Sequence, residues 1–328
     1  MSAIKELLLW SLYLLLIVAG LFSYYANNRI PLEHTPFEFS LKQGSSLKSA
    51  AHQIQQAGGL NGEWQFVLLA RSLGKARQIK PGNYQLEREV SPLKLLSMIS
   101  KGQVEQSSLT IVEGWTFNQL RLAMNADPTL SHDAASLSDT EILKRIGAKE
   151  TSAEGLFFPD TYNYDKGSSD IALLKRAYQL MERQLQESWN KRDAGLPFDS
   201  PYQALILASI VEKETGQPID RPMIASVFIN RLRKNMRLQT DPSVIYGMGD
   251  KFNGNLRKHD LTRDTPYNTY TRYGLTPTPI ALPGLAAMQA VMHPEQSKAL
   301  YFVARGDGSS QFSNTLIEHN KAVKRYQE

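Results

Sequence analysis

Two glutamates stand two residues apart at the end of an apolar run, in the segment LILASIVEKETGQP (residues 205–218). An isolated carboxylate is costly to bury, so a glutamate on such a helix lies at its rim, is paired, or takes part in chemistry. Apolar surroundings raise the pKa of a carboxyl group and keep it protonated near neutral pH. A general acid needs this property, so Glu212 and Glu214 are candidate catalytic residues.

The helical wheel separates the two glutamates. At about 100° per residue, a helix over residues 204–215 has one apolar stripe. Glu214 lies at one edge of this stripe, next to Leu207 and Val211, and Glu212 lies off the opposite edge. The wheel slightly favours Glu214 as the carboxyl group that points into a cleft. The alternative is that both are solvated charges at the helix end, one of them paired with an arginine or a lysine.

The sequence lacks several other signatures of catalysis. It has no cysteine, which excludes disulfides, thiolate zinc sites and cysteine nucleophiles. The stretch GDGSS lacks the spacing of a serine nucleophile elbow and is too short for a phosphate loop. His259, His293 and His319 do not have metal-ligand spacing, and no dinucleotide fingerprint is visible. We therefore expect neither a metal nor a cofactor.

Segments on both sides of the glutamate helix are rich in aromatic and polar side chains. These residues are Phe157, Phe158, Asp160, Tyr162, Gln239, Asp241, Tyr246, Tyr267, Asn268 and Tyr270. Carbohydrate sites combine flat apolar rings with amide and carboxylate groups that form hydrogen bonds. Turn chemistry or core packing is the alternative for any one of them. Their occurrence in segments that flank the glutamate helix favours a sugar-binding cleft.

The N-terminal region predicts a membrane anchor. Residues 7–26 contain no charged side chain and, at about 1.5 Å per residue, span roughly 30 Å, the thickness of a bilayer core. A cleaved signal peptide is the alternative, but its apolar part is normally shorter, about 7–15 residues. Lys5 precedes the apolar run and only Arg29 follows closely, so residues 1–6 are expected in the cytoplasm and the main body outside.

The rest of the chain predicts a globular α+β protein, with 42% hydrophobic and 21% charged residues. Residues 27–36 form a polar connector that contains two prolines. Residues 37–102 have the strand and helix signals of a small α+β module, and residues 103–328 those of a larger mixed α+β domain. The net charge of +5 is spread along the chain, so the composition does not indicate a nucleic-acid partner.

Patterns of apolar and capping residues predict individual elements within residues 103–328. Helices are expected at 169–189, 200–215 and 220–234, and the C-terminal part ends in a hairpin and a closing helix. The segment MRLQTDPSVIYGMG (236–249) has the composition of a loop, and residues 154–164 form an aromatic-rich turn.

Several motifs resemble those of a known family. They are EGW (113–115), GLFFPDTY (155–162), ASIVEKET (208–215), ASVFINRLRKNMRLQTDPSVIYGMG (225–249), YNTY (267–270), GLTPTPIALPG (274–284) and YFVARGDGSSQFSNTLIEHN (301–320). Together with the apolar N-terminus, these motifs closely resemble the YceG-like family of endolytic murein transglycosylases. The resemblance covers nearly the whole chain, and the long match over residues 207–246 is its most specific part.

The resemblance implies a single-pass protein of the bacterial inner membrane with its catalytic body in the periplasm. It implies that residues 37–102 are a LysM-like subdomain and that residues 103–328 are the catalytic domain. It also implies that the enzyme cleaves the β-1,4 bond between N-acetylmuramic acid and N-acetylglucosamine within nascent peptidoglycan strands. The product would carry a 1,6-anhydro-N-acetylmuramoyl end, and cleavage would terminate strand elongation. Penicillin-binding synthases are the partners that such a role implies.

The family's catalytic glutamate aligns with the second glutamate of EKET, which is Glu214; Glu212 is the second candidate. Residue type and motif position make five residues candidates for holding the sugar and its N-acetyl group: Gln239, Asp241, Tyr246, Asn268 and Tyr270. Two other functions stay open. A hydrolytic muramidase would need a second carboxylate, Asp160 or Asp241, facing Glu214. A non-catalytic scaffold would bind peptidoglycan without turnover.

Overall fold

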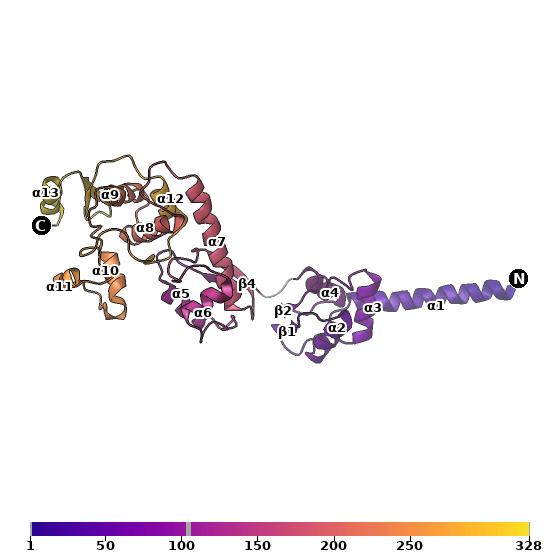
Figure 1. Cartoon of the computed structure of the whole chain (residues 1–328). Coiled ribbons are helices and arrows are strands. Elements are labelled where there is room, and N and C mark those ends of the chain that lie inside the picture. Colours follow the sequence, from indigo (N-terminus) through magenta and orange to yellow (C-terminus); the bar gives the residue numbers. More distant parts are fainter. Residues whose placement is uncertain (1, 103–105, 328) are drawn as a thin grey trace. The chain divides into compact units, whose positions relative to one another are not determined.

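The computed structural model describes residues 2–102 and 106–327, and the chain divides into two compact units. The small unit comprises Met1–Ser107 and Asn163–Ser168, and the large unit comprises Ser108–Tyr162 and Ser169–Glu328. Helices and short strands occur in both units, so the predicted α+β class is confirmed (Figure 1). In the described part of the chain the strands form three two-stranded sheets, β1–β2, β3–β4 and β5–β6.

The chain begins with the long helix α1 (Ser2–Asn27). Its stretch Lys5–Asn27 is long and apolar enough to cross a membrane, judged by length and composition. The large apolar side chains from Leu7 to Leu21 are mostly exposed. A soluble helix would bury them, so their exposure is consistent with the predicted single-pass anchor.

The small unit is built on a hairpin covered by helices. Its elements are β1 (Phe37–Leu41), α2 (Leu47–Gln56), α3 (Glu63–Ser72), β2 (Gly82–Leu86) and α4 (Pro92–Lys101). β1 pairs antiparallel with β2, and alternate residues of β1 point into the core, as a half-buried strand requires. Phe39 stacks on Tyr84 with ring centroids 5.3 Å apart. Ser91 caps α4 by accepting a hydrogen bond from the Lys94 N–H, and Pro92 is the first residue of this helix.

The large unit is mainly helical. Two strands belong partly to each unit: β3 (Gln106–Thr110) begins in the small unit, and β4 (Thr161–Asp165) ends in it. The elements that lie wholly in the large unit are α5 (Phe117–Ala126), α6 (Asp139–Ile146), α7 (Asp170–Asn190), α8 (Pro201–Glu214), α9 (Arg221–Arg233), α10 (Asp241–Met248), the 3₁₀ turn η1 (Gly249–Lys251), α11 (Lys258–Thr262), α12 (Leu285–Met292), β5 (Tyr301–Ala304), β6 (Ser310–Ser313) and α13 (Leu316–Tyr326). The predicted helices and the C-terminal hairpin are present.

Helix α8 lies at the centre of the large unit. Every residue from Ala204 to Val211 is buried, because α7, α9, α10 and α12 all pack against this helix (Figure 1). The wheel predicted one buried stripe, whereas the structure buries all faces of this stretch. An all-round apolar helix is stable only in such a position. Because neighbours surround α8, its last turn is held rigidly where the apolar run ends.

Two local predictions were wrong in part. The segment predicted as a loop over 236–249 contains α10, and the aromatic-rich turn over 154–164 continues into β4. α10 begins with Asp241 and Pro242, an acidic residue and a proline in the first turn, which favour a helix start. The glycines and polar residues of this segment also favour a loop, so the helix was not predicted. The short helix holds Asp241 near the end of α8, whereas a longer loop would not hold it there.

Candidate active site

Glu214 is the last residue of α8 and borders a cavity of about 580 Å³. Ser200 caps the other end of this helix by accepting a hydrogen bond from the Gln203 N–H, and Pro201 is the first residue. Thr215 is already extended, so the helix stops at the glutamate. The carboxyl group therefore projects from a buried, rigid scaffold into an open space, as the sequence predicts for a cleft residue.

The pKa of Glu214 is raised to about 7, first by burial and further by the negative charge of Asp241. Two contacts act in the opposite direction. The hydroxyl of Thr240 donates a hydrogen bond to the Glu214 Oε1, and the positive charge of Arg231 lies nearby. Near neutral pH the protonated and ionised forms are thus present in similar amounts. A group in this state can donate a proton and take one back in the same reaction cycle.

The segment before α10 is fastened to its neighbours by backbone contacts. The Gln239 N–H donates to the Thr269 carbonyl at 3.1 Å, and the Thr240 N–H donates to the Thr269 hydroxyl at 3.0 Å. Gln239 has a φ of 53°, in the left-handed region that non-glycine residues seldom adopt. These bonds hold the backbone in that conformation. They place the Gln239 side chain at the cavity and the Thr240 hydroxyl on Glu214.

Arg231 lies beneath this segment and is only 7% exposed. Its Nη1 donates to the carbonyls of Arg237 and Leu238, at 3.1 and 2.9 Å, and to the Gln239 Oε1 at 3.2 Å. Its Nε donates to the Leu300 carbonyl at 2.7 Å. One guanidinium thus joins α9, the segment before α10 and the start of β5, and it supplies positive charge near Glu214.

Tyr270 and Asp241 form a second polar contact at the cavity. The Tyr270 hydroxyl donates to the Asp241 Oδ1 at 2.6 Å, and both residues line the same space as Glu214. Of the sequence-predicted sugar contacts, the structure therefore brings Gln239, Asp241 and Tyr270 together with Glu214. Among the described residues of this lining, Asp241 is the carboxylate that accompanies Glu214.

The opposite wall of the cavity comes from the C-terminal hairpin and helix. Leu316, His319 and Val323 lie on one face of α13 and line the space together with Tyr301 of β5. The His319 ring stacks on the Tyr301 ring at 5.2 Å between centroids, and the Arg231 guanidinium carbon lies 5.1 Å from the Tyr301 ring centroid. Burial, followed by the charge of Arg231, lowers the pKa of His319. Both effects favour the neutral form of the His319 ring.

The site residues predicted from the sequence did not include Arg231, Tyr301 or His319. Arg231 stands in the basic run NRLRKN, which has the composition of a solvated surface. A signal was available in the spacing, because Ile224, Phe228 and Arg231 recur at i, i+4 and i+7 and share the buried face of α9. Tyr301 and His319 have no comparable signal, since only folding brings the hairpin and α13 to the end of α8.

Glu212 faces a different part of the molecule. Its Oε1 accepts a hydrogen bond from the Arg221 Nη2 at 3.3 Å, and its Oε2 accepts one from the Gly284 N–H at 2.9 Å. Burial raises the pKa of Glu212, against the effects of these two contacts. The side chain thus joins the end of α8 to the starts of α9 and α12. Glu212 does not line the cavity of Glu214.

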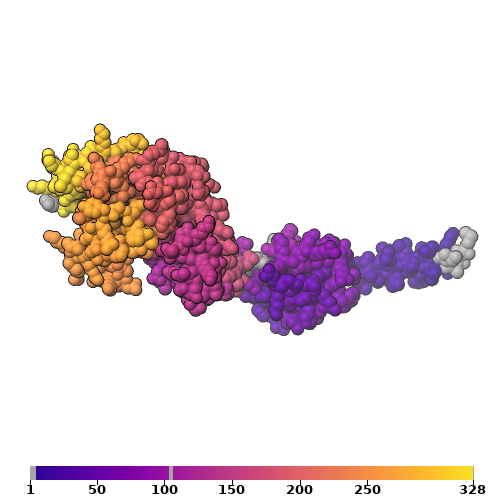
Figure 2. Space-filling view, in the orientation of Figure 1, coloured from indigo at the N-terminus to yellow at the C-terminus, as the bar shows by residue number. Residues whose placement is uncertain are grey.

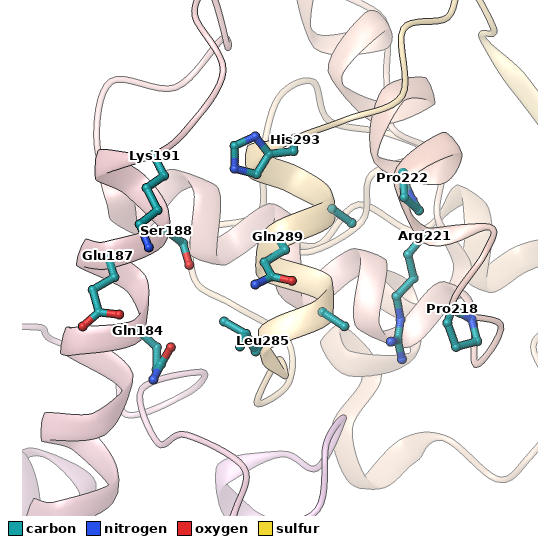
Figure 3. A pocket seen from close by; sticks show the side chains of 12 residues that line it. Gln184, Glu187, Ser188, Lys191, Pro218, Arg221, Pro222, Leu285, Gln289 and His293 are labelled. Carbon is teal, nitrogen blue, oxygen red and sulfur yellow. The ribbon is translucent and has the colours of Figure 1, made fainter.

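A second cavity of about 560 Å³ lies beside Arg221, on the Glu212 side of α8. Figure 3 shows the residues that line it. Gln184, Glu187 and Ser188 lie on α7 and Lys191 just after it, Leu285 and Gln289 lie on α12 and His293 just after it, and Pro218, Arg221 and Pro222 lie around the start of α9. Glu212 forms an ion pair with Arg221, which lines this cavity. The two glutamates are therefore in separate surroundings, as the wheel predicted.

The other three sequence candidates do not line the Glu214 cavity. Asn268 is fully buried, and its Nδ2 donates to the backbone carbonyls of three residues of the preceding segment, Asp260, Leu261 and Arg263. The Tyr246 hydroxyl donates to the Oε2 of Glu154, a buried residue whose pKa burial raises to about 7. Asp160 is exposed and accepts a hydrogen bond from the Thr161 N–H.

Several known proteins and one family model are similar to this chain over most of its length. The family model described as the YceG-like family matches residues 39–325. A Bacillus subtilis protein named endolytic murein transglycosylase is 30% identical over 95% of this chain and 91% of its own length. A Streptococcus pneumoniae protein of the same name is 26% identical over 92% of this chain, which corresponds to 61% of that longer protein.

A solved structure is also similar. The crystal structure of a yceG-like protein from Listeria monocytogenes matches with a TM-score of 0.56 and 30% sequence identity, over 87% of this chain and 97% of that one. The family model and the B. subtilis relative both cover almost the entire chain, including the motifs that surround Glu214. The chain therefore belongs to the YceG-like family.

Proposed function

We propose that this protein is a membrane-anchored lytic transglycosylase that cleaves peptidoglycan glycan strands internally. The observation that carries the proposal is a single carboxyl group, Glu214, with a pKa of about 7 at the wall of a polar cavity. The names of the relatives support the same reaction class. The bond cleaved would be the β-1,4 link between N-acetylmuramic acid and N-acetylglucosamine, and the product would carry a 1,6-anhydro end.

In this mechanism, protonated Glu214 donates its proton to the glycosidic oxygen as the bond from C1 of the muramic sugar breaks. The departing N-acetylglucosamine keeps that proton on its 4-hydroxyl. The C6 hydroxyl of the muramic sugar then attacks C1, and ionised Glu214 accepts its proton. The new C1–O6 bond replaces the glycosidic bond, no water is consumed, and Glu214 returns to its starting state. Because the attack is intramolecular, it has a proximity advantage.

Gln239, Asp241 and Tyr270 are the proposed sugar contacts, since their side chains line the cavity with Glu214. Asn268 and Tyr246 would act indirectly. Asn268 accepts a hydrogen bond from the Tyr270 N–H at 2.8 Å and so positions the residue that contacts the sugar. Tyr246 holds the buried Glu154, whose Oε1 also accepts the Phe117 N–H. Both are therefore proposed as positioning residues.

We also propose a cellular location and binding partners for the protein. α1 would be a single-pass anchor in the inner membrane, with the catalytic unit in the periplasm and residues before Leu7 in the cytoplasm. The β1–α2–α3–β2 order of the small unit supports a LysM-like, glycan-binding role for it. Penicillin-binding synthases, which produce the strands, would be its partners, and cleavage would end strand elongation.

Mass spectrometry of the products separates the three possible functions. Purified glycan strands incubated with the protein should yield fragments that end in 1,6-anhydro-N-acetylmuramic acid. Reducing ends would instead indicate a muramidase, for which Asp241 is the carboxylate placed to assist Glu214. Strands that bind but stay intact would indicate a scaffold. Either of the last two results would overturn the proposal.

Replacing Thr240 with valine is expected to shift the pH dependence of cleavage. The Thr240 hydroxyl stabilises ionised Glu214, so its removal raises the pKa of Glu214 above about 7. The protonated acid then persists to higher pH, and the alkaline limb of kcat/KM should move up by about one pH unit. Thr240→Ser keeps a hydroxyl and should leave the limb close to that of the wild type. An unchanged limb in Thr240→Val would contradict this role of the hydroxyl.

A further inference from the structure

The last turns of α1 belong to the core of the small unit. Ala26 and, just beyond the helix, Ile30 are buried in that core, and Phe22 packs against it. The Tyr25 hydroxyl donates to the Gly62 carbonyl at 3.3 Å, and the Ile30 N–H donates to the Val90 carbonyl at 2.9 Å. These contacts fix the end of the helix to the folded unit, which therefore begins beside Phe22 with no free linker between them.

This attachment overlaps the apolar segment of α1. The part that precedes Phe22, residues 7–21, is about 22 Å long at 1.5 Å per residue, whereas a bilayer hydrocarbon core is about 30 Å thick. Residues 22–26 are apolar or aromatic, apart from Ser23, but Phe22 and Ala26 pack against the small unit and Tyr25 is hydrogen-bonded to it. If the bilayer covers the whole apolar segment, the surface of the small unit around the end of α1 lies several ångströms into the interfacial layer.

The surface of the small unit near the end of α1 has side chains that suit a membrane interface. Helix α3 begins directly after Gly62, whose carbonyl contacts Tyr25, and Figure 1 shows α3 beside the end of α1. Trp64 and Leu68, at i and i+4 on α3, are 69% and 47% exposed, although both are large and apolar. Arg71 follows at i+7 on the same face and is also exposed. Buried Phe66 and Leu69 hold the opposite face of the helix in the core.

We propose that the Trp64–Leu68 face of α3 inserts into the interfacial layer of the bilayer that α1 spans, with Arg71 directed at lipid phosphates. The inference rests on the membrane-anchor part of the proposed function. Tryptophan and tyrosine favour the membrane interface, and arginine can bury its stem while its charge contacts headgroups. Tyr24, near the same end of α1, is a further aromatic side chain that is 69% exposed. The small unit would thus have a second membrane contact besides α1, the helix that continues directly from this unit in Figure 2.

Tryptophan fluorescence can test the depth of this face in the full-length chain. The sequence has four tryptophans, Trp10, Trp64, Trp115 and Trp189. Replacing three at a time with phenylalanine leaves single-tryptophan variants, and a melting temperature close to that of the wild type shows that each variant is folded. The variants are reconstituted in vesicles of phosphatidylcholine and phosphatidylglycerol that are brominated either near the headgroup or near the chain end. Emission quenching by the bromines then reports depth.

We expect strong quenching of Trp64 by the headgroup-proximal bromines and weaker quenching by the deep ones. Trp10, in the apolar segment, is the positive control, and Trp189, on α7 of the large unit, is the matched control that should not be quenched. Quenching of Trp10 without Trp64 would overturn the inference and leave the anchor intact. If neither is quenched, the anchor itself is wrong. A Trp64 emission change caused by added glycan strands, without lipid quenching, would reject the lipid contact in favour of a sugar contact. None of these outcomes depends on the cleavage chemistry.

Discussion

Glu214→Gln is expected to lower strand cleavage by about 10³-fold or more while the protein stays folded. Glutamine has nearly the same shape but can neither donate a proton to the glycosidic oxygen nor accept one from the C6 hydroxyl. General acid–base catalysis typically contributes about 10²–10⁴-fold, and here one carboxyl group would supply both proton transfers. Steady-state cleavage of defined glycan strands measures the loss, and a glycan-binding assay should show that the variant still holds its substrate.

The stability of this variant is a separate check on the same carboxyl group. The pKa of Glu214 is raised from 4.5 in the unfolded reference to about 7 in the folded protein, so ionisation opposes folding as the pH rises between these values. Glutamine removes that pH-dependent cost. Thermal unfolding of Glu214→Gln should therefore occur at a temperature at least as high as in the wild type at pH 8, and the difference between them should shrink toward pH 4.

Glu212→Gln is the matched control. It alters the other glutamate of the same helix end, which contacts Arg221 and Gly284 and does not line the cavity. The amide weakens its ion pair with Arg221, so a modest loss of stability is expected, together with substantial residual cleavage. If Glu212→Gln removes cleavage and Glu214→Gln retains it near the wild-type level, then the catalytic assignment is wrong.

Arg231→Met should cause the second large effect, a loss of about 3 kcal/mol in the free energy of unfolding. Methionine fills similar space without the donors, so the carbonyls of Arg237, Leu238 and Leu300 lose their partner. Each buried acceptor left without a hydrogen bond costs about 1–3 kcal/mol. For a domain of this size the melting temperature should fall by roughly 6–12 °C, which thermal denaturation followed by circular dichroism can measure.

The same substitution should alter the chemistry of the protein that remains folded. The positive charge of Arg231 lowers the pKa of Glu214, so its removal raises that pKa and shifts the alkaline limb of kcat/KM upward. Arg233→Met is a suitable control. Arg233 lies on the same helix but is exposed, and its Nη2 contacts the Gly195 carbonyl at 2.9 Å. A wild-type melting temperature and pH profile in Arg231→Met would refute the proposal that Arg231 stabilises these segments and lowers the pKa of Glu214.

Much of the fold could be predicted because local patterns determine individual elements. The uninterrupted apolar run predicts α1, and Ser91 followed by Pro92 predicts the start of α4, since capping depends on adjacent residues. α10 was missed because its start signal, Asp241 with Pro242, stands among polar and glycine residues that favour a loop. The burial of α8 on all sides could not be predicted from its wheel, because the wheel does not show how many neighbours pack against a helix.

The candidate site was predictable to a smaller extent. Residue type and motif position identified Gln239, Asp241 and Tyr270, which line the cavity, but also Asn268 and Tyr246, which do not. An amide is equally suitable for a sugar hydroxyl and for backbone carbonyls, so its chemistry alone does not distinguish a binding residue from one that organises a loop. Asn268 is fully buried and donates to three carbonyls, which only the folded segment reveals.

The sequence by itself determined the membrane-anchor prediction, the apolar helix, the pair of glutamates at its end and the family. These features depend on composition and on spacing along one element. Only the tertiary structure decided that Glu214 borders a cavity while Glu212 joins three helices, and that Arg231 and His319 complete the surroundings. The pKa of a carboxyl group depends on burial and on charges brought from distant segments, and these exist only after the chain has folded.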